Sequence, residues 1–411
     1  MKEKLIVIGN GMAGMRTVEE LLKIAPNKYD ITVFGEEPYG NYNRIMLSPV
    51  LTGEKTIKEI MINDLDWYNE NNITLHAGKE KKVVKVDRRN RVVISEDGTE
   101  ESYTRLLLAT GSNPFIVPLP GHDLNGVIAF RDIADVNLML DAAKSKTHAV
   151  VIGGGLLGLE AANGLMKQGM DVTIIHNRDV LMNRQLDEPA GKLLQSELES
   201  RGLKFKMPAN TSKIISDNKG CVAGITFEDG TELKTDIVVM AVGIRPNIEL
   251  AKKIGIHCEN GIIVNDTLQT YDPRVYAIGE CIQHRGEVFG LVAPIWDQAK
   301  VCSNHLAGYG IANYRSVATA TKLKVTGVDL YSAGDFVGDE ETDDIVFQDP
   351  KRGVYKKIVI RDNKIIGTVL YGDTIDGSWY FSLMKDGVNI TDIRNTLLFG
   401  QVHLGDAGHG E

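Results

Sequence analysis

The feature that most constrains this chain is a pattern that occurs twice, about 145 residues apart. In each copy a short apolar run leads into Gly-x-Gly-x-x-Gly, which is followed by a helical pattern and a second apolar run. The two motifs cover residues 9–14 and 153–158. In such a motif the first glycine allows a tight turn, the second lets a pyrophosphate approach the backbone, and the third lets helix and strand pack closely. One copy is weak evidence, but two predict two dinucleotide-binding folds.

The residues that follow the second apolar run differ between the copies. Glu36 and Glu37 follow it in the first copy, and a carboxylate there suits the unphosphorylated adenosine ribose of FAD or NAD. The second copy has His176 and Arg178 instead, as expected where a 2′-phosphate is tolerated. Arg178 is equally consistent with a solvated loop charge. The second site therefore favours NADPH without excluding NADH.

Composition excludes several other classes of protein. A chain of 411 residues suggests two to three domains, and its net charge of -9 argues against a nucleic-acid partner. The four cysteines, Cys221, Cys258, Cys281 and Cys302, fit no C-x-x-C pair, zinc ribbon or iron–sulfur pattern. No apolar run is long enough to span a membrane. We therefore expect a cytoplasmic protein with reduced thiols, no metal site and no membrane partner.

Three further turns complete a resemblance to a known family. Ala-Thr-Gly ends at Gly111, Val-Gly ends at Gly243, and Ile-Gly-Glu ends at Glu280. With these turns the chain resembles the two-dinucleotide-binding-domain flavoproteins. Within them it is most similar to the N-terminal flavin part of NAD(P)H-nitrite reductase large subunits, and less so to rubredoxin reductases. The closer similarity rests on residues 8–12, 31–38, 154–160, 277–281, 289–294, 321–325 and 394–401.

The resemblance implies an α/β fold with tandem Rossmann-type domains, as in glutathione reductase. It implies an FAD-binding domain over residues 1–115 and 241–312, an NAD(P)H-binding domain over 116–240, and a C-terminal α+β interface domain over 313–411. The last domain caps the flavin in the family and can form a dimer interface, so a homodimer is expected as one possibility.

The resemblance also implies which residues hold the cofactors. Those expected at the FAD are Gly9, Gly11, Met12, Ala13, Gly14, Glu36, Arg44, Val83, Glu280, Val292 and Lys322. Those expected at the NAD(P)H are Gly153, Gly155, Leu157, Gly158, Glu160, His176 and Arg178. Thr110, Gly111, Gly243 and Gly279 belong to the companion turns. Glu280 stands where the superfamily usually has Asp, as in the nitrite reductase branch. Val292 and Lys322 are equally consistent with no flavin contact, and Glu160 with a helix-surface carboxylate.

The residues that are absent indicate the chemistry. Disulfide reductases of this superfamily need a cysteine pair beside the flavin, and its peroxide-reducing branch uses a single cysteine. Pro49 stands about where that cysteine, or the lysine of the ferredoxin-reductase branch, is expected. Cys281 follows Glu280 and is expected to be a packing residue. We therefore expect no catalytic side chain.

These absences favour electron transfer from NAD(P)H through FAD to a protein acceptor. The acceptor is expected to be a nitrite or nitrate reductase partner, a rubredoxin or a ferredoxin-like protein. The alternative is a flavin-bearing, NADH-binding signalling or scaffold protein with slow turnover. Nitrite reductase large subunits continue into cluster and sirohaem domains, so we expect electron delivery rather than nitrite reduction from these residues; whether Glu411 is the natural end stays open.

Alternation of apolar residues after residue 316 predicts an antiparallel sheet, with helical segments near 379–385 and 390–397. The acidic run 339–344 is expected to be a solvated loop, although an acidic docking patch is the alternative. The basic stretch 79–91 is expected to be an exposed hairpin, although it suits an acidic electron carrier. Residues 406–411 are expected to form a mobile tail.

Overall fold

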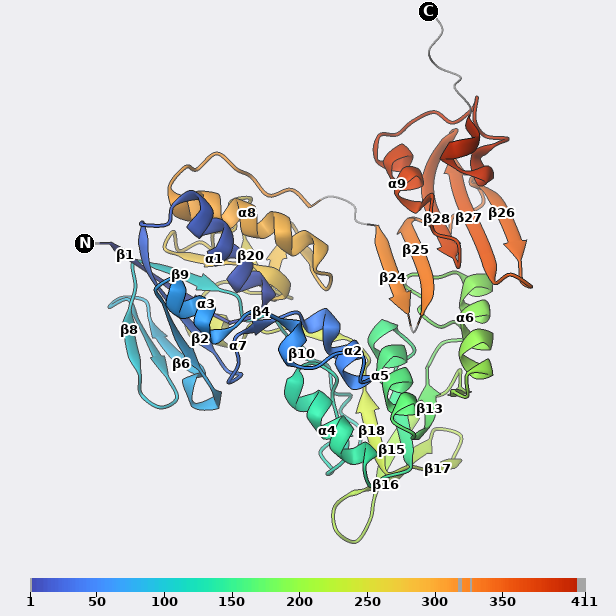
Figure 1. Ribbon diagram of the computed structural model, residues 1–411, viewed down its shortest axis with the longest axis horizontal. Coiled ribbons are helices and arrows are strands. Elements are labelled where there is room, and N and C mark those ends of the chain that lie inside the picture. The colour runs from blue at the N-terminus through green and yellow to red at the C-terminus, as the bar shows by residue number, and fades with distance from the viewer. Residues whose placement is uncertain (1, 317–319, 326, 405–411) are drawn as a thin grey trace, which may run out of the picture. The chain divides into compact units, whose positions relative to one another are not determined.

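The computed structural model describes residues 2–316, 320–325 and 327–404 (Figure 1). It divides into two compact units. The first unit comprises Met1–Phe115, Arg131–Ile133 and Gly243–Val317. The second comprises Ile116–Phe130, Ala134–Val242 and Ala318–Glu411. Among the helices described, none is long and apolar enough to cross a membrane.

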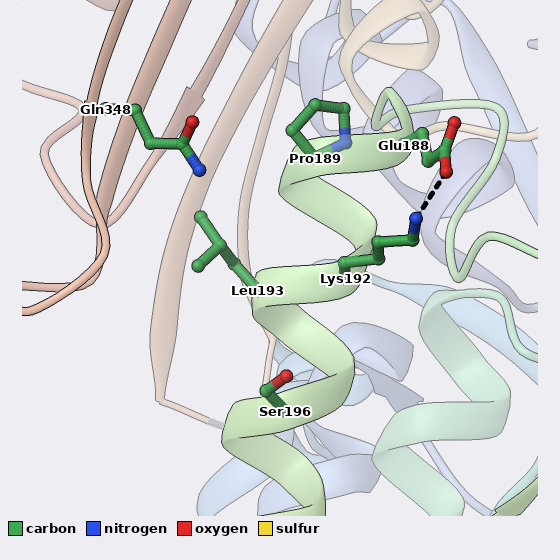
Figure 2. Close-up of a pocket in the computed structure, with 6 residues that line it drawn as sticks. All are labelled: Glu188, Pro189, Lys192, Leu193, Ser196 and Gln348. Atoms are coloured by element: carbon green, nitrogen blue, oxygen red, sulfur yellow. Dashed lines mark hydrogen bonds and ion pairs between the residues drawn. The ribbon is translucent and has the colours of Figure 1, made fainter.

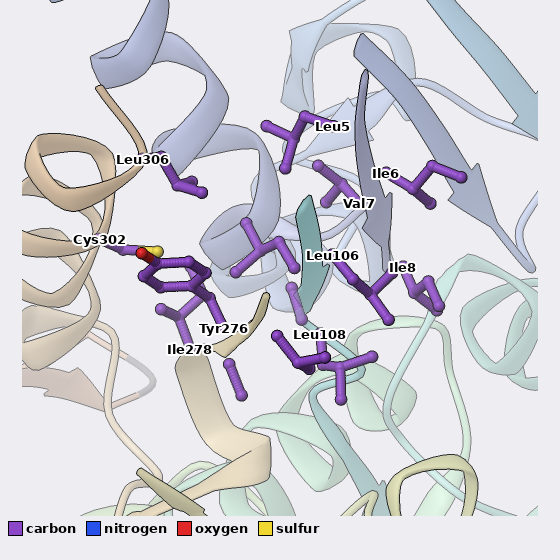
Figure 3. Packing of buried hydrophobic residues seen from close by; sticks show 14 of the residues in the cluster. Leu5, Ile6, Val7, Ile8, Leu106, Leu108, Tyr276, Ile278, Cys302 and Leu306 are labelled. Atoms are coloured by element: carbon purple, nitrogen blue, oxygen red, sulfur yellow. The ribbon is translucent and has the colours of Figure 1, made fainter. Parts of the chain in front are cut away.

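The first unit is built on a five-stranded parallel sheet in the order β21-β9-β1-β2-β5. Its strands are short apolar runs because helices cover a parallel sheet on both faces. Helix α1 (Met12–Ile24) packs beside α8 (Ala293–Ala307). Figure 3 shows Cys302 and Leu306 of α8 beside Tyr276 and Ile278, in the core that also contains the residues of β1. The strands are β1 (Glu3–Ile8), β2 (Tyr29–Gly35), β5 (Ile73–Ala77), β9 (Arg105–Leu108) and β21 (Val275–Ala277).

The second unit repeats this sheet in the order β11-β18-β12-β13-β14, again with parallel neighbours. Helix α5 (Leu156–Lys167) begins within the second glycine motif and packs against β12 and β13. The remaining long helices are α4 (Ile133–Ala143) and α6 (Glu188–Ser200). The strands are β11 (Val127–Ile128), β12 (His148–Ile152), β13 (Asp171–Ile175), β14 (Lys204–Lys206) and β18 (Ile237–Met240).

The duplication extends beyond the glycine motifs. In each unit the chain forms three neighbouring parallel strands, β1-β2-β5 or β12-β13-β14, and then a separate three-stranded antiparallel sheet. The first is β6 (Val83–Asp87), β7 (Val92–Ser95) and β8 (Glu100–Ser102). The second is β15 (Thr211–Ser216), β16 (Val222–Phe227) and β17 (Glu232–Lys234). The predicted tandem Rossmann-type α/β fold is therefore confirmed, and the hairpin expected over the basic stretch 79–91 overlaps the β6–β7 pair.

Shorter elements connect these sheets. They are β3 (Asn41–Tyr42), α2 (Leu47–Leu51), β4 (Met61–Asn63), α3 (Leu65–Glu70), β10 (Ser112–Pro114), β19 (Ile244–Pro246), α7 (Glu249–Lys253), β20 (Ile262–Val264), β22 (Ile282–His284) and β23 (Glu287–Val288).

The C-terminal part is an antiparallel sheet in the order β24-β25-β28-β27-β26, with helix α9 (Gly377–Lys385) against it. Its strands are β24 (Thr321–Val325), β25 (Val328–Gly334), β26 (Asp343–Asp349), β27 (Val354–Arg361) and β28 (Lys364–Tyr371). The sheet and the first predicted helix are confirmed. Parts of the strand and tail predictions fall outside the described residues, at 317–319, 326 and 406–411.

Two C-terminal predictions need correction. The helix predicted over 390–397 is replaced by turns at residues 391–396 and a short 3-10 helix that begins at Leu397, because the Asn389 side chain accepts hydrogen bonds from the backbone and hydroxyl of Thr391. The acidic run is not simply a solvated loop. Asp343 and Asp344 begin β26 and pair with Arg394 and Lys357 at 3.2 and 2.9 Å.

Candidate nucleotide sites

The first glycine loop leaves one open position on its backbone. Gly9 has a φ of +115°, and a Cβ there would collide with the carbonyl oxygen of Ala109. A Cβ on Gly14 would lie 2.5 Å from the carbonyl oxygen of Gly9. A Cβ on Gly11, by contrast, would meet no atom of the described residues within 4 Å. The first and third glycines are therefore needed for packing, whereas the second faces free space.

That free space adjoins the start of α1. Gly11 is the N-cap residue, and Met12 and Ala13 form the first helical positions. Within the described chain no side chain caps this end of the helix, and its first turn has no acidic residue. First-turn N–H groups have no partner within a helix, so they remain available to an anion. The cradle fits a pyrophosphate.

Two carboxylates follow β2. Glu36 is about half exposed and lies 3.0 Å from the ammonium of Lys82. Glu37 accepts hydrogen bonds from Arg44 and from the Tyr42 hydroxyl, both at 2.7 Å. Burial alone would lower the pKa of Arg44, but Tyr42 and Glu37 raise it. Glu36 thus stands just after β2 with an exposed carboxylate, and Arg44 is kept charged by its pairing with Glu37.

The Ile-Gly-Glu turn lies against the start of α1. Gly279 has a φ of +87°, and a Cβ on it would come within 2.8 Å of the Ala13 Cβ. The carboxylate of Glu280 is mostly buried and accepts hydrogen bonds from Ser112 at 2.7 Å and from Arg131 at 2.5 Å. This buried charge is therefore already paired by the protein.

The other companion turns meet in the same unit. The Thr110 hydroxyl donates to the Asn247 carbonyl at 2.7 Å, and the Asn247 N–H donates to the Gly111 carbonyl at 2.9 Å. Gly243, with a φ of +123°, accepts a hydrogen bond from the Phe115 N–H. The structure therefore brings together turns that are separated by more than 130 residues in sequence.

Three further residues are predicted to contact the flavin. Val83 is buried at the start of β6 opposite Ser95. Val292 is the N-cap residue of α8, in the first unit. Lys322 lies on β24, in the second unit, with an exposed side chain. Their roles stay predictions.

The second glycine loop repeats the geometry of the first. Gly153 has a φ of +125° and lies against the Ala241 carbonyl, and Gly158 lies against the carbonyl of Gly153. Gly155 is the N-cap residue of α5, and a Cβ on it would again meet no described atom within 4 Å. Leu157 is exposed in the first turn of α5, which has no acidic residue. The second cradle also fits a pyrophosphate.

The segment after β13 differs from its counterpart in the first unit. His176 stands where Glu36 stands, and its ring lies between the Gly154 N–H and the Val180 carbonyl, both at 3.2 Å. Burial lowers the pKa of His176. Arg178 is exposed and, among the residues described, belongs to no ion pair. Glu160 is half-buried in α5 and interacts with another group.

The cysteines are free thiols in the described structure. Cys281 is completely buried and donates a hydrogen bond to the Ile278 carbonyl at 3.1 Å. Burial raises the pKa of both Cys281 and Cys302. Pro49 lies within α2. Cys281 is thus a packing residue, as its sequence context predicts.

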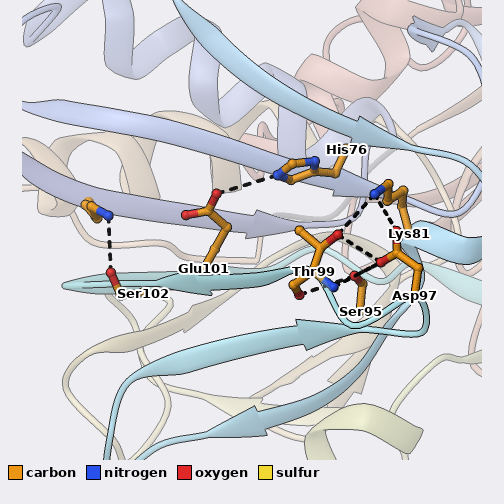
Figure 4. Close-up of polar contacts among 8 residues, drawn as sticks. His76, Lys81, Ser95, Asp97, Thr99, Glu101 and Ser102 are labelled. Atoms are coloured by element: carbon orange, nitrogen blue, oxygen red, sulfur yellow. Dashed lines mark hydrogen bonds and ion pairs between the residues drawn. The ribbon is translucent and has the colours of Figure 1, made fainter.

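Ion pairs occupy part of the basic stretch. Figure 4 shows Lys81 in contact with Asp97 and Thr99, at 2.5 and 3.0 Å. Lys82 pairs with Glu36, and Arg88 with Asp272. The stretch is therefore less positive than its sequence suggests.

A separate pocket lies on the second unit beside α6. It is lined by Glu188, Pro189, Lys192, Leu193, Ser196 and Gln348 (Figure 2). None of these residues belongs to the glycine loops or was predicted to bind a nucleotide.

Sequence reasoning missed three residues of the first unit: Ser112, Arg131 and Gln298. The first two hold Glu280, and the Gln298 side chain accepts a hydrogen bond from the Gly279 N–H at 2.8 Å. Each belongs to no glycine motif. The one signal in the sequence is Glu280 itself, because a carboxylate that becomes buried needs a cationic partner such as Arg131.

The fold and the two cradles define a class of protein that binds two dinucleotides on duplicated Rossmann-type domains. A family model described as "Pyridine nucleotide-disulphide oxidoreductase" matches residues 3–305. The chain belongs to this family, whose members contain FAD and use NAD(P)H. A second model, "Rubredoxin NAD+ reductase C-terminal domain", matches residues 320–388.

Named relatives agree with this assignment. The chain is 50% identical over 391 residues to "Nitrite reductase [NAD(P)H]" of Bacillus subtilis, covering 95% of this chain and 48% of that protein. It is 46% identical over 375 residues to the "Assimilatory nitrate reductase electron transfer subunit" of the same organism, covering 91% and 48%. The chain thus spans about half the length of these relatives.

A solved structure extends the comparison to the whole chain. The crystal structure of NADH:rubredoxin oxidoreductase from Clostridium acetobutylicum has a TM-score of 0.81 and 25% identity. The match covers 97% of this chain and 100% of that one.

Proposed function

We propose that this chain is an FAD-dependent NAD(P)H oxidoreductase that passes electrons to a protein acceptor. FAD is assigned to the first unit, with residues 1–115 and 241–312, and NAD(P)H to residues 116–240. The observation that carries the proposal is the pair of open positions, Gly11 and Gly155, each at an uncapped helix start. Two such positions support two bound pyrophosphates, one on each sheet.

The chain's own residues bind and orient rather than react. When bound, FAD supplies the redox chemistry between a two-electron donor and the acceptor. We assign Glu36 to the FAD ribose and the Glu280–Arg131 pair to the polar wall of the flavin site. Their charges would tune the reduction potential. Cys281 and Cys302 are buried with raised pKa values, so they support a mechanism without thiol exchange.

The nature of the acceptor is inferred from the relatives' names. One is a nitrite reductase, one an electron transfer subunit of nitrate reductase, and one an "NADH-rubredoxin oxidoreductase". These names support a redox protein as acceptor. Four free cysteines support a reducing, cytoplasmic environment. A homodimer through residues 313–411 stays a prediction.

The test is an anaerobic titration of the FAD-loaded protein with NADH and NADPH, followed by addition of acceptors. Loss of the oxidised-flavin absorbance within seconds, and its return on adding rubredoxin or a ferredoxin, is the expected result. Failure of both nucleotides to reduce the flavin would refute the proposal. Slow reduction with a long-lived nucleotide complex would instead favour a signalling or scaffold role.

A further inference from the structure

The two glycine loops differ at their middle residue, which is Asn10 in the first and Gly154 in the second. The Asn10 side chain donates to the Tyr39 carbonyl at 3.0 Å and accepts from the Tyr68 hydroxyl at 2.6 Å. Tyr39 belongs to the segment that follows β2. Asn10 therefore ties the first phosphate loop to that segment.

In the second loop an imidazole takes the place of this side chain. A Cβ on Gly154 would come within 2.8 Å of the His176 ring. His176 comes from the segment after β13 and accepts a hydrogen bond from the Gly154 N–H through Nδ1. Its Nε2 bonds to the Val180 carbonyl. Both loops are therefore held by a side-chain clamp, but only the second clamp can titrate near neutral pH, because burial raises the pKa of the Tyr68 hydroxyl in the first.

The hydrogen bonds define the protonation state that the clamp needs. A carbonyl only accepts, so Nε2 carries the proton, and Nδ1 must be unprotonated to accept from Gly154. A second proton on Nδ1 would face the Gly154 N–H and break that bond. The clamp therefore exists only with a neutral ring.

The charged groups around the ring agree with this state. Burial lowers the pKa of His176 most, and Arg178 lowers it further, whereas hydrogen bonds with Val180 and Asn183 raise it. Asp179 is exposed in the same segment. The backbone carbonyl of Lys206 accepts a hydrogen bond from the backbone N–H of His176, and the Lys206 ammonium bonds to the Thr231 hydroxyl at 2.6 Å.

We propose that His176 is a positioning residue of the second nucleotide site, which holds the phosphate loop in its binding conformation only while the imidazole is neutral. This inference rests on the proposed function. Nicotinamide nucleotide binding then weakens as the pH falls through the pKa of His176, which burial holds below the ordinary value of about 6.5 for histidine. FAD binding does not change over that range, because the amide of Asn10 does not titrate.

The experiment measures the Kd of NAD+ for the FAD-loaded protein by calorimetry between about pH 5.5 and 8, a range that spans histidine titration. NAD+ does not reduce the flavin, and it lacks the 2′-phosphate of NADP+, whose own pKa near 6 would confuse the result. The loss of one hydrogen bond predicts a Kd about three- to tenfold higher at the acidic end.

Variants separate the clamp from a general effect of pH. His176→Gln provides an acceptor and a donor without titrating, so its Kd should be flat and close to the high-pH value. His176→Ala should bind weakly at every pH. His122→Ala is the matched control, because His122 is an exposed histidine that bonds to the Leu119 carbonyl at 2.9 Å. It should follow the unmodified protein.

A second readout needs no variant. Linkage requires saturating NAD+ to lower the pKa of the His176 ring, measured by NMR. Three results would each overturn the inference while leaving the proposed function intact. They are a Kd that is independent of pH in the unmodified protein, a pH-dependent Kd in His176→Gln, and a His176 pKa that saturating NAD+ does not change. Absence of nucleotide binding at every pH would overturn both.

Discussion

Replacement of Gly155 by alanine should weaken nucleotide binding without damaging the fold. Gly155 has a φ of -87° and a ψ of 179°, which alanine adopts freely, and its added methyl would meet no described atom within 4 Å. The loss of unfolded-state freedom stabilises the variant by about 0.4–1 kcal/mol. The poorer N-cap residue offsets this by about 0.5 kcal/mol or more. The free energy of unfolding should therefore stay within about 0.5 kcal/mol of the original.

The methyl group would instead occupy the space through which a pyrophosphate approaches the backbone. We expect the Kd for NAD+ to rise at least about tenfold, which corresponds to about 1.4 kcal/mol. Calorimetry measures the Kd, and urea unfolding measures stability. Bound FAD per chain should not change, because Gly155 belongs to the second unit.

Gly158→Ala is the matched control at the other end of the motif. A Cβ on Gly158 would collide with the carbonyl oxygen of Gly153, which is backbone and has little freedom to move. Overpacking of this kind should lower the free energy of unfolding by about 1–3 kcal/mol. Unchanged NAD+ affinity in Gly155→Ala, or unchanged stability in Gly158→Ala, would refute the assignment of roles within the motif.

Two further predictions concern the first unit. Arg131→Ala leaves the mostly buried Glu280 with Ser112 as its remaining described donor, so the free energy of unfolding of the FAD-free protein, measured in urea, should fall by about 2 kcal/mol. Alanine at the exposed Arg178 is the control and should change the free energy of unfolding little. Equal stability of the two variants would contradict the pairing of Arg131 with Glu280. In the native protein, iodoacetamide should label Cys221 and Cys258 but not the fully buried Cys281 and Cys302, and the labelled protein should keep its turnover. Mass spectrometry identifies the labelled sites. Rapid labelling of Cys281 would contradict a mechanism without thiol exchange.

The fold was predictable from sequence because its signals are local. Two of these signals lie within ten residues of each other and can be recognised in the sequence. One is a run of four apolar residues that forms a buried strand, and the other is the glycine after it that needs a positive φ, as at Gly9 and Gly153. The repetition of these signals predicted two sheets of the same kind. The turns at 391–396 were not predictable in this way, because an apolar spacing that suits a helix competed with the local hydrogen bonds of Asn389.

The partners of the site residues depend on contacts between distant segments. Ser112 and Arg131 lie 168 and 149 residues from Glu280, and no spacing rule joins them. The role of His176 was equally hidden. Its position after β13 was visible, but its bond to Gly154 depends on how two loops fold back on each other. Sequence therefore predicted where the loops are, but not what holds them in shape.

The duplication also explains why the two sites can diverge in ligand while they keep one backbone. Gly9 and Gly153 have φ values of +115° and +125°, and the N-cap glycines have nearly the same φ and ψ. Two loops with the same backbone present the same N–H groups to a pyrophosphate, so the loops themselves cannot discriminate between dinucleotides. We infer that discrimination comes from the side chains that follow the second strand, where Glu36 stands in one unit and His176 and Arg178 stand in the other. A carboxylate accepts from ribose hydroxyls and repels a 2′-phosphate, whereas an imidazole next to an arginine does neither. Exchanging the segments after β2 and β13 should therefore change ligand preference more than any change within the glycine motifs.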